Sequence, residues 1–203
     1  MSKNIGLDRI LHQLEVECPA GFAAGMHIRF AGPLVQFQTY SAEWQDYYTK
    51  NAFALRDPII AYGFVKEGAT RWSEISLPDP FNIFGQAAEF GLKYGLVVSC
   101  GRLTSRSIFG CARADREFTE SEAGRIWELV RILHEVTDPP ESLTDAQKDA
   151  LQLIADGYRH AAAAAKLGIS ESALKARLIS ARNRLLARTT AEAIQRAKDY
   201  KLL

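Results

Sequence analysis

The sequence predicts two domains, an N-terminal α+β domain and a C-terminal all-α domain. The first is expected to be an α/β/α sandwich around a mainly antiparallel sheet. Pairs of short β-branched and aromatic runs, each pair separated by turn residues, predict the sheet. Apolar residues at helical spacing predict its flanking helices and fill the last third of the chain. The segment Thr-Asp-Pro-Pro-Glu-Ser predicts a linker at 137–142, between domains at 1–136 and 143–203.

The charge distribution also changes at the linker. The 203-residue chain has a net charge of +1. Residues 142–203 hold 11 Lys and Arg against 6 Asp and Glu, a net charge of +5, and residues 1–141 hold 14 against 18, a net charge of −4. A basic C-terminal third on an acidic body indicates that only this third meets a polyanion.

Composition excludes several classes of protein. The sequence has neither a secretory h-region nor an apolar run of the roughly 18 residues that a membrane span needs, so we expect a cytoplasmic protein. The three cysteines, Cys18, Cys100 and Cys111, are widely spaced and odd in number. They argue against a disulfide scaffold or a zinc site, and the four scattered histidines add no metal pattern.

The first domain is expected to begin with a helix and a hairpin. Apolar residues at helical spacing predict a helix over residues 5–17, which the Cys-Pro-Ala-Gly segment at 18–21 ends. Residues 26–30 and 34–40 are short alternating runs, and Ala-Gly-Pro at 31–33 lies between them. This pattern predicts two antiparallel strands.

The next segments alternate between helix and breaks. Ser41 predicts the start of a helix over residues 41–54, because serine is a favoured N-cap. The Asp57-Pro58 pair breaks it, and residues 59–65 are expected to form a further turn or two of helix. Residues 70–73 are consistent with either a short strand or a loop.

The rest of the first domain adds a second hairpin between two helices. A helix is expected over residues 82–90, ended by Gly91. Strands are expected over 96–103 and 107–114, joined by a turn at 104–106. A final helix starts at the acidic Thr-Glu-Ser-Glu segment at 119–122 and runs to about residue 136.

The stretch 143–186 predicts two short helices, a tight turn and a third, basic helix. The turn is Leu-Gly-Ile-Ser at 167–170, in which Gly168 can adopt a left-handed conformation and Ser170 can cap the next helix. Together these features predict a helix-turn-helix.

The third helix carries an apolar stripe between cations. The stripe is formed by Leu174, Leu178, Ala181 and Leu185. Cations lie on its two sides: Lys175 and Arg182 on one, and Arg177, Arg184 and Arg188 on the other. This pattern is expected of a helix that packs on its own domain while contacting phosphates, but an ordinary amphipathic helix with solvated charges also shows it.

No enzyme motif is present. The sequence contains no Gly-x-Ser-x-Gly, no phosphate-cradling glycine loop and no His-Glu-x-x-His. The acids Glu120 and Glu122 are explained by the helix start. We therefore expect no enzyme activity and no cofactor.

An aromatic-rich set with one carboxylate is the candidate binding site. Its members are Tyr40, Trp44, Tyr48, Asp57 and Trp72. Tyrosine and tryptophan offer an apolar face and one polar group each, and a buried aspartate beside them needs a donor, which a ligand N–H can supply. The alternative is that the aromatic residues build the core and that Asp57 caps the turn before Pro58.

These residues carry a resemblance to a known family. Trp44, Tyr48, Asp57, Pro58, Trp72 and Gly95, in this order and spacing, resemble the signature of the LuxR-type autoinducer-binding domain. The segment LTDAQKDALQLIADG, followed by KLGIS and LKARL, resembles that family's C-terminal helix-turn-helix. The resemblance covers nearly the whole chain from about Phe22. It implies a bacterial quorum-sensing transcription regulator that binds an N-acyl-homoserine lactone and acts as a homodimer on a palindromic operator in double-stranded DNA.

The resemblance also implies roles for individual residues. Trp44 would donate to the lactone carbonyl and Asp57 would accept from the amide N–H. Tyr48 and Tyr40 would contact the amide carbonyl and the acyl chain. Trp72 would pack on the lactone ring, near Ile83 and Ala87. Cys111 stands where the family usually has Ser or Thr and is expected to line the ligand site. The expected DNA-contacting residues are Ser172, Lys175, Ala176, Arg177, Ile179 and Arg182.

Three departures from the family pattern lie in the second domain. Gln147 replaces a usual Glu, Ala163 replaces a bulky aliphatic residue, and Ile179 projects outward where a polar base-reading residue is expected. They motivate an alternative function: an anti-activator that dimerises with a related regulator and blocks it. A regulator with a non-lactone ligand, or with none, is the third possibility. A phosphorelay receiver is excluded because the N-terminal body lacks the early acidic pair and the strand-end Asp and Lys.

Overall fold

The computed structural model describes residues 3–29, 32–138, 140 and 142–203. The chain divides into two compact units, Ile5–Thr137 and Asp138–Leu203, and each is described by itself. Two residues of the predicted linker, Pro139 and Glu141, lie outside the described residues, as do Phe30 and Ala31 of the predicted first hairpin.

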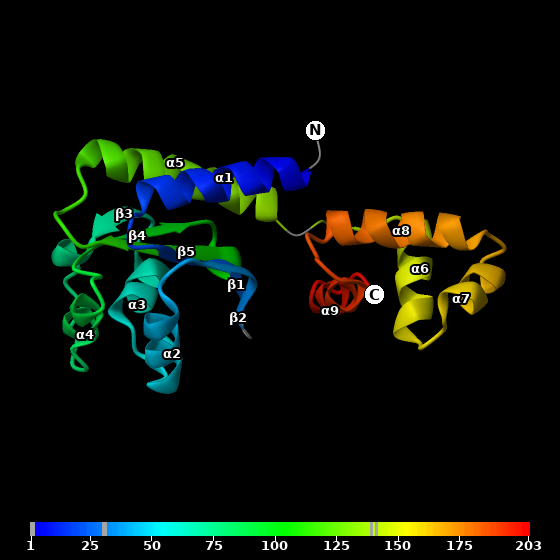
Figure 1. Cartoon of the computed structure of the whole chain (residues 1–203), viewed down its shortest axis with the longest axis horizontal. Helices are drawn as coiled ribbons and strands as arrows, with labels where there is room; N and C mark the ends of the chain where they lie inside the picture. The colour runs from blue at the N-terminus through cyan, green and yellow to red at the C-terminus, as the bar shows by residue number, and fades with distance from the viewer. Residues whose placement is uncertain (1–2, 30–31, 139, 141) are drawn as a thin grey trace. The chain divides into compact units, whose positions relative to one another are not determined.

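The first unit is built on a five-stranded sheet whose neighbouring strands are all antiparallel (Figure 1). Its order is β2-β1-β5-β4-β3. The strands are β1 (Phe22–Arg29), β2 (Gly32–Gln38), β3 (Gly68–Arg71), β4 (Tyr94–Cys100) and β5 (Arg106–Arg113). Both predicted hairpins are confirmed, although β1 begins four residues before the expected start. The open choice at residues 70–73 resolves into the end of β3 followed by a 3₁₀ turn, η2 (Trp72–Glu74).

Helices cover both faces of the sheet, as the α/β/α prediction requires (Figure 1). One face carries α1 (Lys3–Glu17) and α5 (Glu120–Thr137). The other carries α2 (Ala42–Lys50), α3 (Pro58–Val65) and α4 (Ile83–Glu89), together with the 3₁₀ turn η1 (Phe53–Leu55). A third 3₁₀ turn, η3 (Leu103–Ser105), joins β4 to β5, where the expected strand over 96–103 has already ended.

Side-chain caps explain where two of these helices begin. Ser41 Oγ accepts from Trp44 N at 3.3 Å and starts α2. Asp57 Oδ1 accepts from Ile59 N at 2.8 Å and starts α3, with Pro58 at the first helical position. The helix predicted over residues 41–54 ends at Lys50, because Ala52 adopts a left-handed backbone with a φ of 51°.

Strand alternation places two apolar layers on the sheet. On the α1 and α5 side, Phe22, Phe109 and Cys111 pack with Leu14 and Ile126, and all five are at most 1% exposed. On the α2, α3 and α4 side, the inward residues of β5 are Ile108, Gly110 and Ala112. Within the described ranges, every helix is too short or too polar to cross a lipid bilayer.

The second unit is helical. It contains α6 (Asp145–Ala155), α7 (His160–Lys166), α8 (Glu171–Arg184) and α9 (Thr190–Asp199). The stripe predicted on α8 faces its core: Leu174, Leu178, Ala181 and Leu185 are at most 3% exposed. Gly168 has a φ of 65°, and Ser170 Oγ accepts from Ala173 N at 3.2 Å, so both turn residues behave as predicted.

Candidate functional site

An aromatic cluster lies between the sheet and the helices α2, α3 and α4. Tyr40, Trp44, Phe53 and Trp72 are all less than 10% exposed. The Trp44 ring centroid lies 5.6 Å from that of Tyr48 and 6.3 Å from that of Phe53. Edge and tilted contacts at these distances are favourable for aromatic rings. We refer to the cluster, with the adjoining Tyr48, Asp57, Ile83 and Ala87, as the aromatic site.

Asp57 is the buried carboxylate of this region. Its side chain accepts from Tyr48 Oη at 2.7 Å through Oδ2 and from Ile59 N at 2.8 Å through Oδ1, and the residue is 6% exposed. Burial raises the pKa of Asp57 and outweighs the hydrogen bonds from Tyr48 and Ile59, which lower it; the charge of Asp79 raises it further. Burial and the Asp57 charge raise the pKa of Tyr48 far above its usual range, so Tyr48 is a neutral donor. Each carboxylate oxygen retains a lone pair for another donor.

Two buried polar atoms on the side of the sheet that carries the aromatic site lack hydrogen-bond partners among the described residues. They are Trp72 Nε1, a donor, and Asp79 Oδ1, an acceptor. Asp79 uses its other oxygen to accept from Phe84 N at 2.9 Å, and Phe84 packs against the aromatic cluster. Unpaired buried polar groups are rare in folded proteins and often mark functional sites.

Gly95 fixes the position of the Trp72 indole. A Cβ added to Gly95 would lie 2.0 Å from two ring atoms of Trp72, so only glycine allows this contact. The ring also packs against Phe84, with centroids 5.4 Å apart. The contacts with Gly95 and Phe84 therefore fix the direction of the unpaired indole N–H.

Strand β5 contributes small residues to the aromatic site. Tyr40 Oη donates to Gly110 O at 2.9 Å, and Ala112 belongs to the aromatic cluster. Cys111 points to the opposite face, where it packs in the apolar layer beneath α1 and α5 beside Cys18. This corrects the prediction that Cys111 lines the ligand site, because neighbouring residues in a strand face opposite ways. Burial raises the pKa of the Cys111 thiol, with the Cys18 contact adding to the rise.

The other sequence-predicted residues of the first unit are brought together. Tyr40, Trp44, Trp72, Ile83 and Ala87 belong to one cluster, and Tyr48 packs against it. Sequence reasoning missed several aromatic contributors: Tyr47, Phe53, Phe84 and Phe90. The residues around these aromatic side chains in the sequence do not indicate that they are buried. Their burial depends on how α2 and α4 meet over the sheet.

In the second unit, α8 presents the predicted DNA-contacting side chains on its outer surface. Ser172, Lys175, Ala176 and Ile179 are exposed, with Ile179 48% exposed. Arg177 and Arg182 are half-buried. Gln147 caps α6 together with Thr144, and its Nε2 donates to Ser180 Oγ of α8 at 2.9 Å. Ala163 is fully buried.

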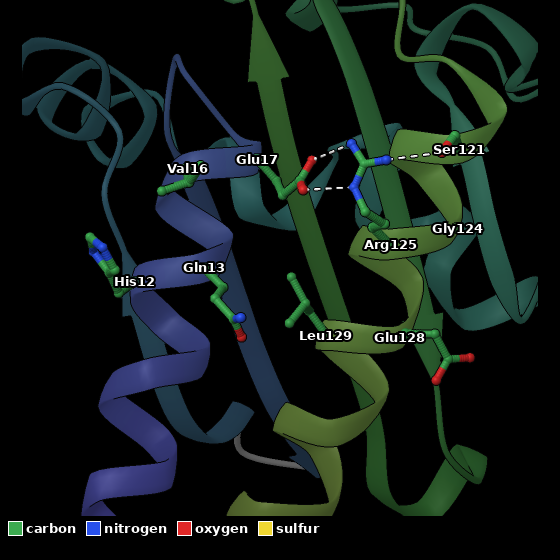
Figure 2. A pocket seen from close by; sticks show the side chains of 9 residues that line it. All are labelled: His12, Gln13, Val16, Glu17, Ser121, Gly124, Arg125, Glu128 and Leu129. Carbon is green, nitrogen blue, oxygen red and sulfur yellow. Dashed lines mark hydrogen bonds and ion pairs between the residues drawn. The ribbon is translucent and has the colours of Figure 1, made fainter.

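A surface groove of about 690 Å³ lies between α1 and α5 (Figure 2). Arg125 crosses between the helices, donating to Glu17 at 2.7 and 3.0 Å and to Ser121 at 2.9 Å. The groove is lined by none of the predicted site residues; its lining is His12, Gln13, Val16, Glu17, Ser121, Gly124, Arg125, Glu128 and Leu129. In the part of the chain that the structure describes, no three His, Cys, Asp or Glu side chains gather as metal ligands.

Comparison with known proteins gives one family match and several matches in fold. Residues 9–136 match the model of the autoinducer binding domain. SdiA of Escherichia coli is 17% identical with a TM-score of 0.55, and the match covers 97% of this chain and 91% of SdiA. SdiA in complex with octanoyl-rac-glycerol is 18% identical, with a TM-score of 0.53 and coverages of 95% and 87%.

A third structure extends the comparison of fold. CepR2 of Burkholderia cenocepacia, an N-acylhomoserine lactone dependent transcription factor of the LuxR family, is 18% identical with a TM-score of 0.52. That match covers 67% of this chain and 83% of CepR2. At these identities the solved structures show a shared fold. No curated protein sequence matches the chain.

Proposed function

We propose that this chain, which belongs to the autoinducer-binding domain family, is a quorum-sensing transcription regulator. Its first unit binds an N-acyl-homoserine lactone, and its second unit binds DNA as part of a homodimer. The observation that carries the ligand proposal is the hydrogen-bonded pair of half-buried Tyr48 and buried Asp57, together with a buried Trp72 indole N–H of the same aromatic cluster that has no acceptor among the described residues. In this proposal the protein binds a ligand and DNA in the cytoplasm and catalyses no reaction.

The polar groups of the aromatic site match those of an acylated lactone amide. Asp57 accepts from the amide N–H, because its carboxylate has lone pairs beyond the Tyr48 and Ile59 bonds. Trp44 donates to the lactone carbonyl, and Tyr48 and Tyr40 contact the amide carbonyl and the start of the acyl chain. Trp72 packs on the lactone ring, near Ile83 and Ala87.

The residues around the headgroup also indicate which acyl chains the site accepts. On the side of β5 that faces the ligand, the structure has Gly110 and Ala112 in place of the expected Cys111. These two residues offer the ligand no side-chain hydroxyl or thiol. We therefore expect weak discrimination between plain and 3-substituted acyl chains. The structure of SdiA with octanoyl-rac-glycerol keeps a non-lactone acyl ligand as an alternative.

Thermal unfolding of the full chain tests the ligand proposal. A ligand at about 100 times its Kd adds about 2.7 kcal/mol to the free energy of unfolding. We expect the Tm to rise with at least one member of a series of N-acyl-homoserine lactones of increasing chain length. An unchanged Tm throughout the series contradicts the ligand proposal.

The DNA proposal depends on α7, the turn at 167–170 and α8, which we interpret as a helix-turn-helix with α8 in the major groove. Lys175, Arg177 and Arg182 are its phosphate- and base-contacting cations, and Ser172 and Ala176 lie on the same outer surface. The net charge of +5 over residues 142–203 favours approach to a polyanion.

Ile179 supports the second candidate function. It places an exposed apolar side chain among the predicted base-contacting residues, where it offers no hydrogen bond to a base edge and favours contact with thymine methyl groups. An anti-activator that dimerises with a related regulator needs no base reader. Gel shifts on inverted-repeat DNA separate the two: salt-sensitive, sequence-specific binding by the purified chain supports the regulator, and its absence supports the anti-activator.

A further inference from the structure

A buried histidine cluster fastens the end of α5 to the sheet. His27 of β1 is 0% exposed, and its ring Nδ1 lies 2.8 Å from Ser105 Oγ in η3. Its Nε2 lies 3.0 Å from His134 O and 3.2 Å from Thr137 Oγ1, both in the last turn of α5. The His27 and His134 rings stack with their centroids 4.3 Å apart. Ser107 of β5 joins them, since its Oγ accepts from His27 N at 3.0 Å and lies 2.7 Å from His134 Nδ1.

A β-bulge turns His27 toward α5. The register of β1 against β5 shifts between Gly25 and Ile28, and His27 has a left-handed backbone there, with a φ of 51°. Met26 belongs to the apolar layer beneath α1 and α5, so regular alternation would direct His27 to the other face. The bulge instead places both residues on the α5 side, while Ile28 packs with the cluster around Ile108. The chain therefore accepts an uncommon backbone conformation that brings a titratable ring to this position.

The hydrogen bonds show where the His27 ring carries its proton. His134 O is one of the last four carbonyls of α5, which the helical ladder leaves for other donors, so the bond to it places a proton on Nε2. Thr137 Oγ1 donates its own hydrogen to Leu133 O at 2.6 Å and can accept from the same Nε2–H. In a neutral imidazole the other nitrogen is an acceptor, so Nδ1 accepts from the Ser105 hydroxyl. A second proton, on Nδ1, requires that hydroxyl to turn round.

Burial and stacking limit the charge that the two rings can carry. Moving a charged imidazolium from water to the fully buried position of His27 is unfavourable. The half-buried His134 ring is better solvated, and it lies at the end of α5, where the helix dipole favours one cation. Two cations 4.3 Å apart would repel each other in this site. The folded pair therefore holds one proton at most, on His134, whereas the unfolded chain binds two at acidic pH.

The charges around the pair nearly cancel, so they do not raise this limit. His134 packs on Gly101, and the neighbouring Cys100 thiol is neutral, because burial raises its pKa to about 11. Two ion pairs surround that thiol: Glu67 with Arg106, and Glu135 with Arg131. The elements packed against the pair also carry Arg29 at the end of β1, Arg102 before η3 and Asp138 after α5. Two arginines and one aspartate do not attract a further proton.

We propose that His27 is an acid-sensitive latch at the end of the first unit. α5 ends at Thr137, and the second unit begins at Asp138. The neutral His27 ring holds the last turn of α5 on the sheet, and uptake of a proton by His27 releases that turn, where the chain passes from one unit to the other. The latch requires neither ligand nor DNA. Its consequence for DNA binding rests on the proposed function: acidic pH weakens the control of the second unit by the ligand.

Hydrogen exchange of the full chain tests the latch. The open form binds one more proton than the closed form, so closure is favoured at neutral pH and is lost as the pH falls below the ordinary pKa of histidine, about 6.5. Opening of the last turn of α5 should therefore increase by about 20- to 30-fold between pH 7 and pH 5. The measurement is the amide exchange of peptides that cover the end of α5, with each rate divided by the intrinsic exchange rate at that pH. His27→Gln keeps an amide N–H for His134 O and cannot titrate, so its protection should not change with pH.

His12→Gln is the matched control, because the His12 side chain belongs to the same unit and is 77% exposed. This variant should keep the full pH dependence of the wild type. Asp57 also titrates, with the opposite sign, because its raised pKa makes its contribution to stability greatest at acidic pH. That contribution is common to the wild type and both variants, so it cancels when they are compared at the same pH.

The His27 ring gives a second readout that needs no variant and serves if His27→Gln does not fold. Long-range nitrogen NMR spectra of the wild type, labelled at histidine, distinguish the charged ring from the two neutral forms. We expect the His27 ring to remain in the neutral Nε2–H form at every pH at which the last turn of α5 is protected. The exposed rings of His12 and His160 should become charged near pH 6.5, the ordinary range of histidine.

Three results would overturn the inference. Constant protection of the wild type between pH 7 and pH 5 removes the latch. An equal loss of protection in the wild type and in His27→Gln shows that another group responds to acid. A charged His27 ring in a chain whose last turn of α5 is still protected shows that the buried site tolerates the proton. Each result leaves the proposed function standing, because the experiment contains neither ligand nor DNA.

Discussion

Replacing Asp57 with asparagine should change stability and ligand affinity in opposite directions. The asparagine side chain would keep the same shape and both neighbours: its oxygen can accept from Ile59 N, and its amide can donate to Tyr48 Oη once the hydroxyl rotates. The substitution therefore removes a buried negative charge with little loss of hydrogen bonding. Because burial raises the pKa of Asp57, the charge itself costs stability at neutral pH.

The pH dependence of this cost has a definite sign. A raised pKa in the folded state means that the contribution of Asp57 to stability is fully present below its ordinary pKa of 3.8 and is lost as the pH rises through the raised value. Asp57→Asn removes that loss. The variant should therefore match the wild type at acidic pH and be equally or more stable at pH 7.

Ligand binding responds the other way. A hydrogen bond to a charged acceptor contributes about 1.5–3 kcal/mol, against about 1 kcal/mol for a neutral one. The variant should thus lose about 1–2 kcal/mol of binding free energy, which corresponds to a Kd weaker by about 5- to 30-fold. Wild-type affinity should also fall as the pH drops through the raised pKa of Asp57, while the affinity of the variant stays constant.

Paired thermal melts and calorimetric titrations across pH 4–8 measure both quantities on the same samples. A variant that is clearly less stable at pH 7 would show that the Asp57 charge is structural. Unchanged affinity would show that Asp57 does not contact the ligand. Either result refutes the reasoning from burial and hydrogen bonding.

Three further substitutions test neighbouring parts of the site and α8. Gly95→Ala places a methyl group 2.0 Å from the Trp72 ring, so it should cost at least about 1–3 kcal/mol in urea unfolding and abolish the ligand-induced Tm shift; wild-type behaviour would refute the tight contact. Cys111→Ser buries a hydroxyl in the apolar layer beneath α1 and α5, so stability should fall by about 1–3 kcal/mol while the ranking of ligands by Kd stays the same; an altered ranking would return Cys111 to the ligand side. Lys175→Ala should weaken DNA binding uniformly across sequences and reduce the slope of log K against log salt by about 1, measured by fluorescence anisotropy; an unchanged slope would exclude a phosphate contact.

Local chemistry made much of the fold predictable. Ser41, Asp57 and Ser170 each lie where a helix begins, and the side chain of each accepts a hydrogen bond from a backbone N–H of the first turn. Gly168 likewise adopts the left-handed conformation expected of it. Such features depend on a few neighbouring residues, so the sequence alone reveals them.

The errors arose where distant contacts decide the outcome. Ala52 ends α2 four residues early by adopting a left-handed backbone that alanine disfavours, while Phe53 beside it is buried in the aromatic cluster. The family resemblance predicts Cys111 at the ligand site, whereas the structure turns it to the α1 and α5 side, because a difference of one position in a strand exchanges the two faces of a sheet. Only the register of β5 against β1 and β4 settles that choice.

The candidate site shows the same division. The spacing of Trp44, Tyr48, Asp57 and Trp72 was visible in the sequence, and the structure brings these residues to one side of the sheet. The unpaired Trp72 Nε1 could not be predicted, since it follows from what surrounds the side chain in three dimensions.

Native mass spectrometry tests the ligand proposal most directly. The full chain and its Gly95→Ala variant would be produced in cells supplied with a mixture of N-acyl-homoserine lactones and sprayed under conditions that preserve non-covalent complexes. We predict one bound lactone per wild-type chain and none on the variant. A wild-type chain that carries no small molecule, or that carries the same molecule as the variant, would contradict a lactone site at Trp44, Asp57 and Trp72.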